Sequence, residues 1–115
     1  LLGKNRKLVA ITLGEDGCLL RNRNGYVYQP TFAVDVCDTT GAGDSFMGAL
    51  LFQATRTGFS IDALDMEDLR KTAEFANACS AGSTRKYGSM AAMTYMEEAR
   101  WILKNVAKKE PAYDL

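Results

Sequence analysis

The residues most suited to chemistry lie in one glycine-rich run, Asp38-Thr39-Thr40-Gly41-Ala42-Gly43-Asp44-Ser45-Phe46. A glycine turn that opens a helix presents several backbone N–H groups to an anion, with the positive end of the helix dipole behind them. A carboxylate at that place would repel a phosphate, so we expect Asp44 to accept a proton from an attacking hydroxyl. The run therefore predicts phosphoryl transfer to an alcohol. Taken alone, Gly41 and Gly43 fit an ordinary strand-to-helix turn equally well.

The composition argues against several other kinds of chemistry. The 115 residues include no histidine, which excludes the Ser-His-Asp and Cys-His mechanisms and imidazole metal ligands. Lys and Arg number 14, as do Asp and Glu, so no net charge indicates nucleic acid or a membrane surface. The glycines are not followed by the Gly-Lys-Ser/Thr of a Walker A loop. They are followed by an acid where a dinucleotide-binding turn has a further glycine, which disfavours an oxidoreductase.

The three cysteines, Cys18, Cys37 and Cys79, are widely spaced and show no metal-binding or redox-pair pattern. We expect them to be reduced, small residues of the core of a cytoplasmic protein. No apolar run approaches the length needed to span a bilayer, so the sequence predicts no membrane partner.

Hydrophobic patterning predicts the strands that must position the glycine-rich run. Residues 8–13 form a short β-rich apolar run, which is typical of a strand buried on both faces. Residues 18–21 and 26–29 flank Asn22-Arg23-Asn24-Gly25, whose Asn-Gly pair is a strong signal for a hairpin turn. Residues 31–36 alternate like a further strand that leads into the run.

Three helices are expected after the run. Residues 46–54 are apolar nearly all round, which predicts a buried helix, and Gly48 within it indicates close approach of another backbone. A second helix begins near Asp65 as its N-cap. A third begins at Thr94, with Glu97 at capping-box spacing. The residues expected on the buried faces of the second and third helices are Leu69, Ala73, Ala76 and Ser80, and Met96, Ala99, Leu103 and Val106.

The later half of the second helix, residues 76–82, consists of small residues that could contact a ligand or another helix. We favour helix packing for Ala78 and Ala81. The order of strand, hairpin, strand, glycine turn and three helices is typical of the end of an α/β sandwich, within a single domain.

Residues 38–48 resemble, position for position, the C-terminal signature of the ribokinase-like (PfkB) sugar kinases. Ile11-Thr12-Leu13-Gly14-Glu15-Asp16-Gly17 resembles the turn of that family that lies along the nucleotide. Phe75-Ala76-Asn77-Ala78-Cys79, followed by Thr84-Arg85-Lys86-Tyr87-Gly88, resembles its adenine-side helix and loop. The resemblance implies that residues 1–115 are a single partial domain. That domain would be the nucleotide-binding, C-terminal portion of a Rossmann-like three-layer α/β/α sandwich.

The activity that the resemblance implies is ATP-dependent phosphorylation of a sugar hydroxyl, of the fructokinase or ribokinase type. Asp44 would be the base, and the amides of Gly41, Ala42 and Gly43 would form the anion hole. Solvent-facing turn positions are the alternative for Glu15 and Asp16, and an internal packing bond is the alternative for Asn77. The residues expected at the nucleotide are Thr12, Leu13, Gly14, Glu15, Asp16, Gly17, Gly43 and Asn77.

The resemblance also implies Mg²⁺ with ATP, bound mainly through phosphates and water, and a potassium ion beside the anion hole. The expected potassium ligands are the Asp38 carboxylate, the Thr40 carbonyl and backbone oxygens near Ser83, Lys86 and Gly88. For Asp38, the alternative is a cap on the following turn. Ala92 stands where some relatives offer a hydroxyl, which weakens the potassium assignment.

The partners expected from the resemblance are ATP and a small sugar, with a homodimer as one option for a complete protein. We expect the 115-residue chain alone to be inactive as a kinase. The alternative to a kinase role is an inactive fragment, or a nucleotide-binding or interaction module. An exposed sheet edge would then invite self-association.

Overall fold

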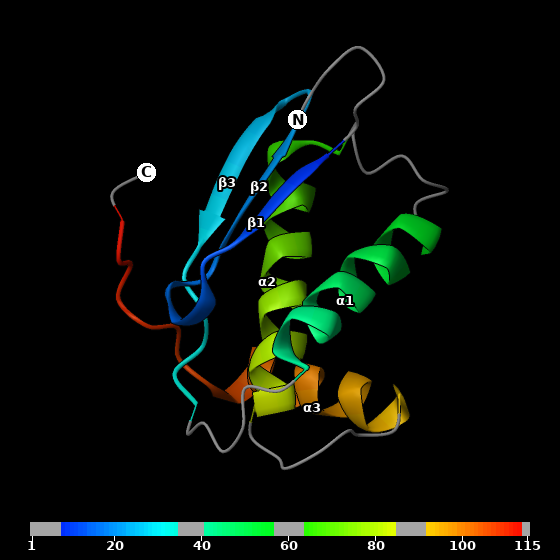
Figure 1. The fold of residues 1–115 in the computed structure, drawn as a ribbon, viewed down its shortest axis with the longest axis vertical. Helices are drawn as coiled ribbons and strands as arrows, with labels where there is room; N and C mark the ends of the chain where they lie inside the picture. The colour runs from blue at the N-terminus through cyan, green and yellow to red at the C-terminus, as the bar shows by residue number, and fades with distance from the viewer. Residues whose placement is uncertain (1–7, 35–40, 57–63, 85–91, 114–115) are drawn as a thin grey trace.

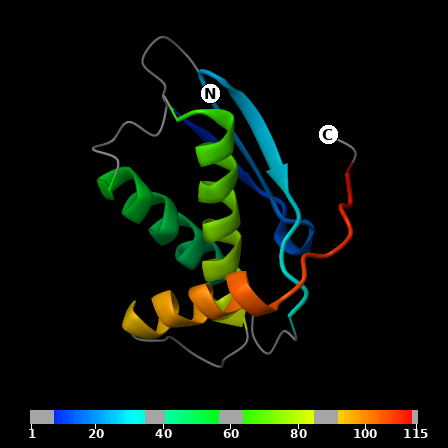
Figure 2. The same cartoon turned by 180° about the vertical axis from the view of Figure 1, so that it is seen from behind.

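The computed structural model describes residues 8–34, 41–56, 64–84 and 92–113. In these residues a three-stranded sheet packs on a long central helix, and two further helices flank that helix (Figure 1). Figure 2, seen from behind, shows α2 in front of the sheet. In the described part of the chain the helices cover one face of the sheet, which gives two layers of the expected three. The elements are β1 (Val9–Thr12), the 3₁₀ turn η1 (Gly14–Asp16), β2 (Cys18–Asn22), β3 (Gly25–Gln29), α1 (Ala42–Arg56), α2 (Met66–Thr84) and α3 (Ala92–Asn105).

The predicted hairpin is confirmed. Strands β2 and β3 pair antiparallel from Cys18 opposite Gln29 to Asn22 opposite Gly25, which leaves a two-residue turn. The Asn22 side chain donates to the Leu64 carbonyl at 2.9 Å, so this turn is fixed to the segment just before α2. The sheet order is β1-β2-β3, with β1 antiparallel to β2.

The first strand forms where it was expected, but the prediction that it is buried on both faces is wrong. Val9 is half-buried, and the rest of β1 is exposed, with Ile11 46% accessible. The reason is that α2 packs chiefly on β3 and then on β2, so β1 lies on the side of the described sheet that α2 leaves uncovered. The short apolar run identified the strand, but the partner elements determine how deeply it is buried.

Residues 31–34 do not form the further strand that their alternation indicated. Phe32 makes an isolated antiparallel bridge with Lys108, and its side chain is buried. A segment that leaves β3 and meets the chain after α3 therefore takes the place of that strand. Residues 35 and 36 lie outside the described residues.

Helix α1 is confirmed, but its predicted burial on all sides is wrong. Phe46, Ala49 and Leu50 are buried, whereas Met47 and Leu51 are 51% and 62% exposed. Among the described elements α1 packs chiefly on α2, and a single neighbour covers only one stripe of a helix. No described atom lies within 4 Å of a Cβ placed at Gly48, so the expected close backbone approach there is also wrong.

Helix α2 begins as predicted. The Asp65 carboxylate accepts a hydrogen bond from the Asp68 amide at 2.8 Å, which is the geometry of an N-cap. Leu69, Ala73 and Ala76 are fully buried on the predicted face. The small residues of its later half serve helix packing, because a Cβ at Gly82 would lie 2.8 Å from the Glu98 side chain of α3.

Helix α3 begins at Ala92, two residues before the predicted start. Its buried stripe contains Ala99 and Ile102, with Val106 packed against the core. Leu103 was expected on this stripe but is 41% exposed. Consecutive side chains on a helix point in directions about 100° apart. The buried stripe runs through Ile102, so the next residue, Leu103, points away from it. In the part of the chain described, no helix is long and apolar enough to cross a membrane.

Candidate active site at the start of helix α1

The glycine turn before α1 has the geometry expected of an anion site. Gly41 has a φ of +82°, in the region that favours glycine. Its carbonyl accepts a hydrogen bond from the Ser45 amide at 2.9 Å, which is the first bond of the helix. The amides of Gly41, Ala42, Gly43 and Asp44 precede that bond, at the helix end where the first four N–H groups lack intrahelical partners. The three predicted anion-hole residues therefore lie together at the start of α1.

The Asp44 side chain lies in the first turn of α1 and is exposed. A base for an incoming hydroxyl must be accessible, and this side chain is not turned into the core. Gly43 is exposed as well, with no described atom within 4 Å of a Cβ placed there. A carboxylate and the leading amides of one helix thus share an open surface. Asp38, Thr39 and Thr40 lie outside the described residues.

The predicted nucleotide turn is closed by its own backbone. The Leu13 amide donates to the Gly17 carbonyl at 2.8 Å, and the Asp16 and Gly17 amides donate back to Leu13 and Gly14. Thr12, Gly14 and Glu15 are exposed, whereas Asp16 and Leu13 are half-buried. The solvent-facing alternative thus fits Glu15 better than Asp16.

The two glycines of this turn differ in their surroundings. Gly14 has a φ of +59° and open space around it. Gly17 has a φ of +105°, and a Cβ there would lie 2.0 Å from the Gln29 carbonyl oxygen. Only a residue without a side chain permits that approach between the turn and the end of β3.

Asn77 is buried in the middle of α2. Its amide nitrogen donates to the carbonyls of Gln29 at 3.1 Å and Pro30 at 3.3 Å. These are internal bonds, as in the alternative interpretation, and their cause is that a buried amide among alanines must find acceptors. A nucleotide contact through Asn77 stays a prediction.

Gly17 and Asn77 are brought together by a peptide that the sequence did not single out. Both lie against Gln29–Pro30, the backbone that ends β3. The only sequence signal for this was a polar residue in a run of small ones, since such a residue must have a partner. In Figures 1 and 2 the η1 turn and the start of α1 lie at the same level of the molecule, near the end where β3 leads out of the sheet.

Cys18 and Cys79 are free and buried, as expected. Burial raises the pKa of the Cys18 thiol to about 12, although a hydrogen bond with the Asn77 side chain lowers it in part. Burial also raises the pKa of Cys79 to about 11. Both thiols are therefore protonated at neutral pH, and the thiolate is the nucleophilic form. Cys37 lies outside the described residues.

The structure leaves the predicted potassium site open to test. Ser83 is buried near the end of α2, with its hydroxyl bonded to the Ser80 carbonyl at 2.7 Å. The other expected ligands, Asp38, Thr40, Lys86 and Gly88, lie outside the described residues. The described ranges contain no cluster of three or more His, Cys, Asp or Glu residues that could hold a metal ion.

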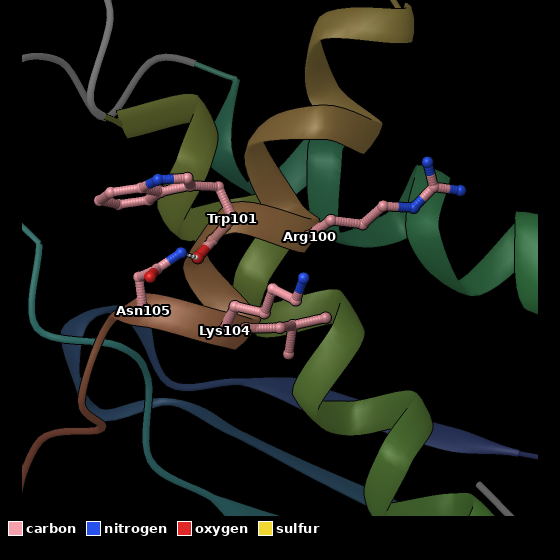
Figure 3. Close-up of a pocket in the computed structure, with 5 residues that line it drawn as sticks. Arg100, Trp101, Lys104 and Asn105 are labelled. Carbon is pink, nitrogen blue, oxygen red and sulfur yellow. Dashed lines mark hydrogen bonds between the residues drawn. The ribbon is translucent and has the colours of Figure 1, made fainter.

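A shallow depression of about 440 Å³ lies on α3, away from these residues (Figure 3). The Asn105 amide donates to the Trp101 carbonyl at 2.9 Å within it. It contains none of the predicted site residues, so we do not assign the site there. Its lining residues are Arg100, Trp101, Leu103, Lys104 and Asn105.

Comparison with known proteins places the chain among carbohydrate kinases. The sequence model of the pfkB family carbohydrate kinases matches residues 1–95. A relative described as probable fructokinase-3, from Arabidopsis thaliana, is 43% identical over 106 residues, which cover 92% of this chain and 30% of the relative.

Two solved structures are similar to the chain. The first is the aminoimidazole riboside kinase from Salmonella enterica, complexed with aminoimidazole riboside and an ATP analog. It has a TM-score of 0.69 and 36% identity, over 86% of this chain and 32% of that one. The second is a double mutant of the fructokinase from Vibrio cholerae O395, with fructose, ADP and potassium ion bound. It has a TM-score of 0.56 and 31% identity, over 76% and 27% of the two chains.

These likenesses confirm the expected α/β class and the ribokinase-like fold. The chain spans about 30% of the length of the relatives that it matches. With its signature turn at the start of α1 and its family match over residues 1–95, the chain belongs to the pfkB family of carbohydrate kinases.

Proposed function

We propose that this chain supplies the phosphate-binding and nucleotide-binding part of an ATP-dependent kinase that phosphorylates a sugar hydroxyl. The observation that carries the proposal is the exposed Asp44 carboxylate beside the leading amides of α1. In this arrangement Asp44 takes the proton of the sugar hydroxyl as that oxygen attacks the γ-phosphorus. The amides of Gly41, Ala42 and Gly43 hold the charge on the phosphoryl oxygens.

The nucleotide is assigned to the turn of residues 12–17. Its exposed edge, with Thr12, Gly14 and Glu15, leaves room for a ligand. The solved relative from Salmonella enterica contains an ATP analog, which supports a nucleotide as that ligand. Mg²⁺ would neutralise phosphate charge when ATP is bound. Free thiols at Cys18 and Cys79 support a reducing compartment such as the cytoplasm.

The proposal can be tested in a chimera in which residues 1–115 replace the matching segment of the Salmonella enterica kinase. We expect this chimera to release ADP when both ATP and aminoimidazole riboside are present. A folded chimera that binds ATP but releases no ADP would contradict the assignment of the base and anion hole to this chain. The unmodified Salmonella enterica kinase is the positive control.

The 115-residue chain alone is expected to show no sugar-dependent ADP release. Catalysis requires the hydroxyl to be held in line with the phosphoryl group, and the chain spans about 30% of its relatives' length. The measurement is a coupled ADP assay on the purified chain, with the chimera assayed in parallel. Turnover by the chain alone would show that it forms a complete active site.

We also expect the chimera to work faster in potassium than in sodium at equal ionic strength. The reason is that Asp38 and Thr40 would place a monovalent cation beside the anion hole, as the potassium-bound fructokinase relative suggests. Initial rates in the two chlorides measure the effect, with choline chloride as the cation-free reference. Identical rates in all three salts would remove the cation from the proposal.

A further inference from the structure

The chain beyond α3 folds back along the sheet and reaches the η1 turn. Figures 1 and 2 show this segment, residues 106–113, passing from the end of α3 to the outside of that turn. We call residues 106–113 the C-terminal strap. It lies beyond the family match, which ends at residue 95.

Backbone pairing anchors the first part of the strap. The Ala33 amide donates to the Ala107 carbonyl, and the Lys109 amide donates to the Thr31 carbonyl, each at 2.9 Å. The Lys108 ammonium lies 2.6 Å from the Glu74 carboxylate of α2 and 2.9 Å from the Gln29 side-chain oxygen at the end of β3. The strap is thus fixed to both β3 and α2 before it reaches the turn.

The second part of the strap contacts the turn through Tyr28. The Tyr28 hydroxyl donates to the Asp16 carbonyl at 2.7 Å and accepts a hydrogen bond from the Ala112 amide at 3.2 Å. The Tyr113 ring stands edge-on to the Tyr28 ring, with centroids 5.8 Å apart. Its hydroxyl lies 3.4 Å from an Asp16 carboxylate oxygen.

Lys109 adds a further contact, since its ammonium lies 3.4 Å from the Glu15 carbonyl. All of these contacts reach the carbonyls or the outer carboxylate of the turn. Among the described residues, Thr12 and Gly14 take part in none of these contacts. At Glu15, the third exposed position assigned to the nucleotide, the strap contacts only the main-chain carbonyl. The strap therefore supports the turn and leaves Thr12 and Gly14 of its open edge uncovered.

The turn needs such support, because Gly14 and Gly17 both have positive φ and glycine has the least restricted backbone of all residues. We propose that the C-terminal strap is a positioning element that holds the η1 turn in one conformation for the nucleotide, with Tyr28 of β3 as the link between strap and turn. This inference rests on the proposed function of the turn.

The sharpest test is Tyr28→Phe, which keeps the ring and removes only the hydroxyl. Tyr26→Phe is the matched control, because Tyr26 lies on the same strand, its side chain is exposed, and its hydroxyl has no hydrogen bond to a described residue. Ala112→Pro removes the amide donor on the strap side and leaves β3 untouched, so it tests the same link if Tyr28→Phe folds poorly. Amide hydrogen exchange of the 115-residue chain is measured at Asp16 and Gly17, with Leu20 as reference, with and without MgATP.

Without nucleotide, Tyr28→Phe is expected to speed exchange at Asp16 and Gly17 by about three- to tenfold, the value of one ordinary hydrogen bond. Ala112→Pro should act in the same direction, and Tyr26→Phe should match the unaltered chain. With MgATP, Tyr28→Phe should need a three- to tenfold higher nucleotide concentration for the same protection of the turn. A purely structural role would not move that concentration.

The possible outcomes distinguish a failure of the strap's role from a failure of the nucleotide assignment on which it rests. Unchanged exchange at the turn in both Tyr28→Phe and Ala112→Pro would overturn the inference that the strap holds the turn. Faster exchange with an unchanged MgATP concentration for protection overturns its positioning role. If MgATP protects the turn of the unaltered chain at no concentration, the nucleotide assignment itself fails, whatever the exchange rates of the variants show.

Discussion

Asp44→Asn in the chimera should lower kcat by roughly a hundred- to ten-thousandfold, the loss typical of removing a general base. Asn is close to Asp in size and keeps a polar group at the first turn of α1, so the anion hole should remain formed. The rate falls because no carboxylate is left to take the proton of the hydroxyl. ADP release gives kcat, and calorimetry gives the affinity for ATP, which should not fall.

The matched control for this substitution is Asp65→Asn. Asp65 is an exposed carboxylate at the start of another helix, and Asn caps a helix about as well as Asp. We therefore expect kcat to stay near that of the unaltered chimera. Near-normal turnover in Asp44→Asn would refute the base, and equal losses in both variants would point to a general effect of charge.

Gly17→Ala is expected to destabilise the chain by more than about 4 kcal/mol, a loss reserved for severe packing or backbone conflicts. The new Cβ would lie 2.0 Å from the Gln29 carbonyl oxygen and 2.8 Å from the Pro30 Cα. Both are backbone atoms, so no side chain can move aside. Because small domains are stable by only about 5–15 kcal/mol, the substitution should remove a large share of the chain's stability. Urea denaturation followed by circular dichroism measures the change.

Gly14→Ala provides the comparison within the same turn. Its φ is also positive, at +59°, but no described atom lies within 4 Å of the added Cβ. The expected cost is the left-handed backbone penalty alone, about 1–2 kcal/mol. If the two variants lose the same stability, the contact between Gly17 and the end of β3 is not what requires glycine there.

Local signals predicted the parts of this protein that neighbouring residues decide. The hairpin and the Asp65 cap depend on a few adjacent residues, and both were confirmed, although the two-residue turn is Arg23-Asn24 and Gly25 begins β3. The glycine turn before α1 was also predictable, because its glycines, its carboxylate and the helix that follows are consecutive in sequence. Its role in catalysis stays a prediction.

Burial was predicted less well, because it depends on which elements come to lie against each other. The patterns of β1 and α1 indicated full burial, yet Ile11 and Leu51 are exposed. The reason is that α2 packs on β2 and β3 rather than on β1, and covers only one stripe of α1. The strap escaped prediction for a related reason. Tyr28 and Tyr113 have no common periodicity, and only the folded chain brings their rings together.

The Gln29–Pro30 peptide couples two motifs that the sequence presents as separate. Gly17 packs against this peptide from the turn, and the Asn77 side chain donates hydrogen bonds to its carbonyls from α2. In a closely packed interior such parts cannot shift independently. A bulky nucleotide analogue that displaced the turn would consequently disturb the contacts of α2 at Asn77 as well. Discrimination among analogues therefore depends on the packing of β3 and α2 and not on the turn alone.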